Sequence, residues 1–423
     1  MAAFAWISRH DDRRLAFCWG LLLPVDYITG VHTVVFDVAR YAGVVWLCWR
    51  TRPTLPESGR RTVFHLAGAI VAVGLVRGVF ALPRADRNSL IFAGVMLVST
   101  ACVTLLALRP QVHRAVAGGY LAGVTLSATV SAMQAMHLTT LRHGDDYSER
   151  FPGVSTYTML LTWQLAFALV LAVYVLATAA PRSRLWWAAA ASVPILMLAT
   201  VTNGAQGGFM GIGAAVVAAA WAYRDRLGWS RIGRYLLAGV LGVAAITIVV
   251  VASGIDVPTI DGFLGDGGYR NEKARWEVAG QGWREMWNHP VLGMGRTNFM
   301  DRYTIAPHFL PIDSGVTAGL LGFAVASYLL FVILRLIWQG PADRRPETVA
   351  GFALLAAMAA NTVTESYGPF IGLSRVSVLF LAVVAVKGFH PTADEVSPDP
   401  PSPGRESTAE VGRSRRRAQN RRG

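Results

Sequence analysis

The sequence predicts an all-α, polytopic membrane protein with about twelve transmembrane spans and one long extracytoplasmic loop that contains an amphipathic helix. Hydrophobic residues make up 53% of the 423 residues and charged residues only 15%. Apolar runs recur along nearly the whole chain, and many approach the roughly 20 residues that a membrane-spanning helix needs. Arginines gather in alternate connections between these runs, as expected for a protein that crosses a membrane repeatedly.

The apolar runs define about twelve candidate spans. They cover residues 14–29, 31–49, 62–82, 89–108, 114–137, 154–178, 185–202, 206–222, 235–253, 314–338, 347–364 and 367–388. The first and eighth are the least typical, because the first includes Asp26 and the eighth includes several glycines. An alternative for the first is a half-buried hairpin with the second.

The arginines also predict the orientation, because short cytoplasmic loops accumulate Arg and Lys. With twelve spans, groups such as Arg60 and Arg61, Arg182 and Arg184, and Arg344 and Arg345 all fall on one side. We therefore expect a multi-pass protein of the plasma (inner) membrane with both termini in the cytoplasm. Residues 254–313 then form the one long loop on the outer side.

This topology divides the chain into four parts. Residues 1–253 form spans one to nine, 254–313 the extracytoplasmic loop, and 314–389 the last three spans. Residues 390–423 are rich in Pro, Ser and charged residues, which cannot bury a core, and are predicted to be a disordered basic cytoplasmic tail. No cleavable signal peptide is expected, because the first apolar run lacks an evident cleavage site and is followed at once by the second.

The formal charge of +13 is explained by membrane topology and by anionic membrane lipids as partners, since most of it lies in predicted cytoplasmic segments. Nucleic acid is not an expected partner, because the arginines are scattered among apolar segments. Cys18, Cys48 and Cys102 fall within or beside spans and show neither a disulfide framework nor metal-ligand spacing. They are predicted to be small core residues.

Within the long loop, residues 272–288 repeat tryptophan at helical spacing. Trp276, Trp283 and Trp287 share one side, and Glu277, Gln281 and Arg284 adjoin them. Such a helix is expected along the membrane surface with its indole rings at headgroup depth. The alternative is that the tryptophans pack the loop onto the transmembrane bundle.

A series of motifs begins within this helix and continues after it. They are Arg275, the segment Pro290 to Gly295, the pair Asn298-Phe299, His308, and Gly319-Leu320-Leu321-Gly322. Their order and spacing resemble the O-antigen ligase and O-antigen polymerase family of membrane glycosyltransferases, most closely over residues 190–340. Two departures indicate a divergent subgroup. Phe309 stands where the family usually has Asn after the His, and Gln206 stands where it tends to have an Arg.

The resemblance implies a GT-C-like helical bundle. It also implies transfer of a glycan from a polyprenyl-diphosphate-linked donor to an acceptor hydroxyl at the outer membrane face, with inversion at the anomeric carbon and without a metal or other cofactor. The acceptor would be a glycan, a lipid or a wall polymer in surface-polysaccharide biosynthesis. Ligase and polymerase activity both remain open, because they share the same donor chemistry.

A metal-independent reaction on a diphosphate needs cations, and arginine supplies a permanent charge with forked donors. The candidates for binding the donor phosphates are Arg270, Arg77, Arg84 and Arg375, with Arg275 as a catalytic group. Alternatives are snorkelling of Arg77 to the membrane interface and a buried pair between Arg375 and Glu365.

His308 is the predicted catalytic base, because histidine ordinarily has a pKa near working pH. Asp313 and the acidic cluster Asp145, Asp146 and Glu149 are alternatives or acceptor-binding groups. Gln206 lies in a polar, glycine-rich turn, 202–208, that either lines the carbohydrate cavity or lets two helices pack closely. Asp37 and Arg40, one helical turn apart, are predicted to pair structurally.

Two other classes of function remain as alternatives. One is a transporter or flippase for the same lipid-linked sugar, although no repeated halves with interrupted helices are evident. The other is a non-catalytic envelope assembly or sensor protein. Turnover of a lipid-linked glycan by the purified protein separates the enzyme from both.

Overall fold

The computed structural model describes residues 12–26, 33–53, 55–139, 151, 153–155, 158–203, 206–252, 266–362, 370 and 372–388. The predicted tail, 390–423, and the acidic cluster at 145–149 lie outside these residues. So do the side chains at 266–272 and most of those at 226–251.

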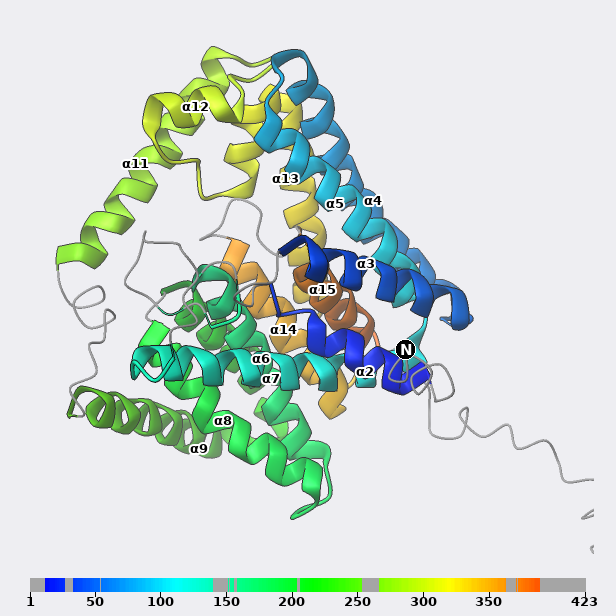
Figure 1. The fold of residues 1–423 in the computed structure, drawn as a ribbon, viewed down its shortest axis with the longest axis vertical. Helices are drawn as coiled ribbons and strands as arrows, with labels where there is room; N and C mark the ends of the chain where they lie inside the picture. Colours follow the sequence, from blue (N-terminus) through cyan, green and yellow to red (C-terminus); the bar gives the residue numbers. More distant parts are fainter. Residues whose placement is uncertain are drawn as a thin grey trace, which may run out of the picture. The chain divides into compact units, whose positions relative to one another are not determined.

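The described residues form helices with no strand, so the prediction of a helical protein is confirmed for them (Figure 1). The helices are α2 (Asp12–Leu22), α3 (Thr33–Arg50), α4 (Glu57–Ala81), η1 (Leu82–Arg84), α5 (Arg87–Ala107), η2 (Pro110–Val112), α6 (His113–Ala135), α7 (Thr158–Thr178), α8 (Arg184–Asn203), α9 (Gln206–Ala252), α11 (Asp266–Asn288), α12 (Arg296–Tyr303), α13 (Leu310–Gln339), α14 (Pro346–Thr362) and α15 (Leu373–Val386).

Six helical segments within the described ranges are long and apolar enough to cross a membrane. They are Glu57–Arg84, Arg87–Ala107, Pro110–Ala135, Leu160–Thr178, Arg184–Asn203 and Leu310–Gln339, and each corresponds to a predicted span. Exposed tryptophans stand next to arginines near several helix ends, for example Trp49 beside Arg50 and Trp338 near Arg335. This arrangement is typical of a membrane interface, and the chain is a helical membrane protein.

The other predicted spans differ from the expectation. Helix α2 has only 11 residues, or about 16 Å at 1.5 Å per residue, which is too short to cross the roughly 30 Å hydrocarbon core. Helices α14 and α15 have 17 and 14 residues. The eighth and ninth predicted spans form one continuous helix, α9, of 47 residues. The arginine-rich stretch between them contains only isolated glycines and no proline, so nothing in it stops a helix.

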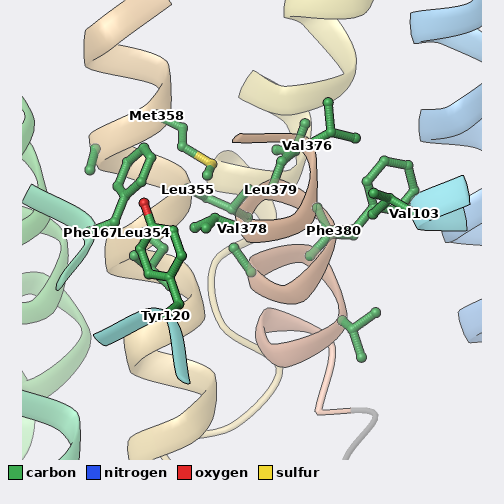
Figure 2. Close-up of a cluster of buried hydrophobic side chains, with 14 of the residues drawn as sticks. Val103, Tyr120, Phe167, Leu354, Leu355, Met358, Val376, Val378, Leu379 and Phe380 are labelled. Carbon is green, nitrogen blue, oxygen red and sulfur yellow. The ribbon is translucent and has the colours of Figure 1, made fainter. Parts of the chain in front are cut away.

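Helices α14 and α15 supply the central part of the hydrophobic core. Leu354, Leu355 and Met358 of α14 lie beside Val378 and Leu379 of α15, with Tyr120 and Phe167 of neighbouring helices against α14 (Figure 2). These side chains are almost fully buried. The two short C-terminal helices therefore belong to the interior of the bundle.

Arg40 joins the N-terminal segments. Its guanidinium donates to Asp37 at 2.5 Å and to Asp26 at 2.6 Å, so the predicted pairing of Asp37 and Arg40 is confirmed. The indole of Trp19 donates to the Arg40 carbonyl at 2.8 Å. Asp26, which weakened the first predicted span, is thus a partner of a buried arginine.

Helices α4 and α13 pack against each other and position the candidate site. They run in opposite directions, because Arg77 near the C-terminus of α4 contacts Asp313 near the N-terminus of α13, while His65 of α4 contacts Tyr328 of α13. Helix α13 begins at Leu310, four residues before the predicted start at Ser314, with Pro311 in its first turn. His308 therefore lies two residues before a helix.

Candidate functional site

Residues 266–319, here called the cap, contain both predicted catalytic residues, His308 and Arg275, together with Arg270 and Asp313. Helix α11 confirms the predicted helix at 272–288, and it packs against the start of α13. Trp276 and Trp287 are exposed, whereas the ring of Trp283 contacts Phe323 of α13 edge to face. The contact of Trp283 supports the packing interpretation of the tryptophan series, and the position of the indoles at headgroup depth stays a prediction.

The cap is held by the loop between α4 and α5. Arg84 donates to the carbonyl oxygens of Gly293 at 2.5 Å and Thr317 at 3.2 Å. Asp86 accepts hydrogen bonds from the hydroxyl and the backbone N–H of Thr297 at 2.7 and 3.2 Å. Burial disfavours the Asp86 carboxylate, but hydrogen bonds from Ser89 and Thr297 outweigh this and lower its pKa. Arg84, a predicted donor-binding residue, is thereby placed at the base of the cap.

Arg77 and Asp313 form an ion pair with no exposed surface on either side chain. Arg77 Nη1 donates to Asp313 Oδ2 at 2.7 Å and to the Ser314 hydroxyl at 3.1 Å. Buried charges are tolerated only when paired in this way. The predicted contact of Arg77 with donor phosphate, and of Asp313 with acceptor, would require this pair to open.

The motif Pro290 to Gly295 lies against the motif that begins at Gly319. The N–H of Leu320 donates to the carbonyl of Pro290 at 2.8 Å, and the N–H of Gly295 to that of Val316 at 2.9 Å. Gly319 has a φ of 65°, and a Cβ there would lie 2.3 Å from the Pro290 oxygen. Only glycine fits this position, so Gly319 both interrupts α13 and lets the segment after α11 approach it.

His308 lies where these elements converge. Burial lowers the pKa of its imidazole to about 4, and the positive charge of Arg275 contributes in the same direction. Asp313 acts in the opposite direction, and Arg296 adds to the lowering. Nδ1 of His308 is buried and has no hydrogen-bond partner within the described part of the chain. The charge of Arg275 thus acts on His308, and with a pKa of about 4 the imidazole is neutral at pH 7.

Arg296 is a site residue that the sequence interpretation missed. It begins α12, lies over the ring of Phe92 at 5.2 Å, and comes within 3.8 Å of Asp313 Oδ2. Its side chain is 11% exposed, so it stands at the boundary between the buried pair and the surface. Its position directly after Gly295, at the first residue of a helix, is the sequence feature that could have identified it.

The remaining predicted residues are more distant or not described. Arg375 lies in α15 over the ring of Trp163 at 4.9 Å. Glu365, its alternative partner, is outside the described residues, as are the side chains of Arg270 and Gln206. Near Gln206, a Cβ on Gly208 would lie 2.1 Å from Thr162, so this glycine permits close packing of α9 on α7. This supports the packing alternative for the polar turn.

A second polar cluster fixes α12 to α11. Glu285 of α11 is 5% exposed and accepts hydrogen bonds from Tyr303 at 2.7 Å and Arg302 at 3.1 Å. The Tyr303 hydrogen bond is the main cause of the lowered pKa of Glu285. Through this contact α12, which carries Arg296, is fixed to α11, which carries Arg275.

Chemically, the group combines a neutral imidazole with the permanent charges of Arg275 and Arg296. A neutral imidazole accepts a proton, and guanidinium groups bind phosphate oxygens with forked donors. The chain matches no protein-family model, and a search of curated proteins found no significant match.

Proposed function

We propose that this protein is a membrane glycosyltransferase that moves a glycan from a polyprenyl-diphosphate-linked donor to an acceptor hydroxyl. The observation that carries the proposal is the grouping of a neutral His308 with Arg275 and Arg296 in the cap. The order of the motifs, which resembles that of the O-antigen ligase and polymerase family, supports the same reaction. The predicted location is the outer face of the plasma membrane.

In the proposed reaction, His308 accepts the proton of the acceptor hydroxyl. The acceptor oxygen then bonds to the anomeric carbon from the side opposite the diphosphate, which inverts that centre. The bond between this carbon and the diphosphate oxygen breaks, and the electron pair leaves with polyprenyl diphosphate. Arg275 and Arg296 stabilise the negative charge that develops on this leaving group.

The low pKa of His308 fits this order of events. In the free protein, burial and the nearby arginines keep the imidazole neutral and ready to accept a proton. A bound diphosphate brings negative charge next to the same arginines, which favours the protonated imidazole and strengthens the base. The donor therefore prepares the base for proton transfer.

The arginines in and beside the cap divide into two groups under this proposal. Arg77 and Arg84 hold the cap in place through Asp313 and through backbone carbonyls, respectively. Arg275 and Arg296 act on the leaving diphosphate. Arg270, three residues before the first described side chain of α11, stays a predicted phosphate contact.

The proposal is tested by replacing His308 with Gln and measuring release of polyprenyl diphosphate by the purified protein from a lipid-linked glycan donor. Loss of a general base lowers the rate by about 10²- to 10⁴-fold. His289→Gln is the matched control, because His289 is a half-exposed histidine of the same cap that touches only Glu285 among the described ion pairs. Its rate should stay close to wild type.

The same variants in cells distinguish the alternatives. Under the proposal, His308→Gln cells accumulate outward-facing donor, and the length of its glycan separates ligase from polymerase. A transporter would instead leave the donor unconsumed by the purified wild-type protein. Full turnover by His308→Gln at normal protein levels would contradict the assignment of the base.

A further inference from the structure

A pocket of about 320 Å³ lies between α4 and α13, at the ends of these helices that are farthest from the cap. Tyr328 is 15 positions after Asp313 on α13, or about 22 Å along a helix axis. The polar lining of the pocket consists mainly of Arg61, His65, Tyr328, Arg335, Gln339 and Lys387. The distribution of arginines predicts that this end is cytoplasmic.

The lining is basic. Arg61, Arg335 and Lys387 line the pocket, and none of its lining residues is acidic. Arg335 makes no ion pair within the described residues, and the Lys387 ammonium donates at 2.6 Å to Gln339, a neutral amide. Burial lowers the pKa of Lys387, and the positive charge of the neighbouring Arg335 lowers it further. Glu57, four residues before Arg61, pairs with Arg61 at the surface.

A histidine and a tyrosine complete the polar side of the pocket. His65 Nε2 and the Tyr328 hydroxyl are 2.7 Å apart, and their rings stack at 6.0 Å between centroids. A tyrosine hydroxyl and an imidazole N–H are common donors to phosphate oxygens. The pocket therefore offers an anion both charge and directed hydrogen bonds.

The apolar part of the pocket lining, Phe331, Val332 and Leu336, belongs to α13 and adjoins the exposed outer face of that helix. Phe331 lines the pocket and is 56% exposed, and Leu334 and Trp338 on the same helix are also exposed. Exposed apolar side chains on a membrane-crossing helix face acyl chains, and tryptophan at its end lies at headgroup depth. A ligand here has lipid tails beside it.

We infer that this pocket binds the phosphate headgroup of an anionic glycerophospholipid, whose acyl chains lie along the exposed face of α13 around Phe331 and Leu334. Basic pockets between membrane helices on the cytoplasmic side are suited to such headgroups. The occupant is a lipid because the cations adjoin a surface that faces hydrocarbon. The inference does not depend on the proposed glycan transfer.

The test uses the purified full-length protein and native mass spectrometry with phosphatidylglycerol, and with phosphatidylcholine as the zwitterionic comparison. The Arg335→Gln/Lys387→Gln variant should bind phosphatidylglycerol about 30-fold more weakly, at roughly 1 kcal/mol for each cation near an anionic lipid. The matched control is Arg52→Gln/Arg184→Gln, which removes two exposed arginines at the predicted cytoplasmic end outside the pocket. It should bind as wild type does.

Each outcome is decisive once both variants elute as intact protein. Equal losses in the two double variants would show a general charge effect and overturn the pocket. Equal affinity of wild type for phosphatidylcholine would overturn the anionic headgroup. Displacement of phosphatidylglycerol by millimolar inorganic phosphate would show that the site recognises free phosphate and would overturn the lipid. A charge-preserving Lys387→Arg variant should retain binding.

Discussion

At the residue scale, burial and the positive charge of Arg275 determine the protonation state of His308. Its pKa of about 4 is below the ordinary value of 6.5, first through burial and then through the charge of Arg275. The neutral form is the reactive one in the proposed mechanism. Activity should therefore persist to mildly acidic pH and decline as the pH falls through about 4.

Arg275→Gln should move this acid limit upward. Without the neighbouring positive charge, the pKa of His308 rises toward its ordinary value, so the proton is bound, and activity lost, at a higher pH. The measurement is kcat/KM against pH with the purified protein, because this ratio reports ionisation of the free enzyme. Arg284→Gln, on the exposed side of the same helix, should leave the acid limb in place. An unmoved limb in Arg275→Gln would contradict the electrostatic coupling.

The Arg77–Asp313 pair leads to a prediction about stability. Asp313→Asn leaves the Arg77 guanidinium buried without its closest counter-charge, which should cost about 3–5 kcal/mol. Arg77→Met combined with Asp313→Leu removes both charges of the pair and should recover part of this loss, because Arg296 still loses its contact with Asp313. Thermal unfolding of the purified variants measures both effects. A donor-binding role for Arg77 predicts the reverse pattern, in which Arg77→Met raises KM for the donor and leaves the unfolding temperature unchanged.

At the element scale, α11 approaches the His308 segment through one glycine. A Cβ on Gly282 would lie 2.7 Å from Ile312 Cγ2 and 3.0 Å from Pro307 Cγ, whereas Gly280, half a turn away, has no neighbour within 4 Å. A substitution at Gly282 therefore tests close packing, whereas the same substitution at Gly280 tests helix propensity alone. The sequence indicated the helix and its tryptophan series, but it did not distinguish the two positions.

Gly282→Ala should lower activity by displacing residues 307–312, and with them His308. Gly280→Ala should keep full activity and stabilise the helix by about 0.5–1 kcal/mol, since alanine is the better helix former. Turnover of the donor and thermal unfolding, measured on both variants, check this. Equal activity of the two would show that α11 does not position His308.

The same scale shows where sequence patterns succeed. Contacts that are local in sequence, such as Asp37 with Arg40 or the tryptophan series, follow from helical spacing and were predictable. The grouping of His308 with Arg275 was expected only through the resemblance of their motifs. The fixing of the cap by Arg84 and Asp86 joins residues more than 200 positions apart, and periodicity holds no information about such contacts.

At the whole-molecule scale, composition predicted a helical membrane protein, and six predicted spans correspond to helices of sufficient length and apolarity. The remaining spans could not be settled in this way. Hydropathy measures how apolar a segment is, and α15 is apolar because it lies inside the bundle rather than because it is long enough to cross a bilayer. For α9, charge between two apolar runs suggested a turn, but arginine is a good helix former and the helix continues.

The two ends of α4 should lie on opposite sides of the membrane. The helical segment Glu57–Arg84 has 28 residues and is about 42 Å long at 1.5 Å per residue, enough to cross the hydrocarbon core. Ser58 is exposed at its start, and Asn298 is exposed in the cap that Arg84 holds at its other end.

In a variant with Cys18, Cys48 and Cys102 replaced by Ala, Asn298→Cys should react with an impermeant maleimide in intact cells. Ser58→Cys should react only after the membrane is opened, and the parent without added cysteine should not react. Labelling of both positions from the same side would contradict the crossing by α4, and labelling with the sides exchanged would place the cap, and the proposed transfer, in the cytoplasm.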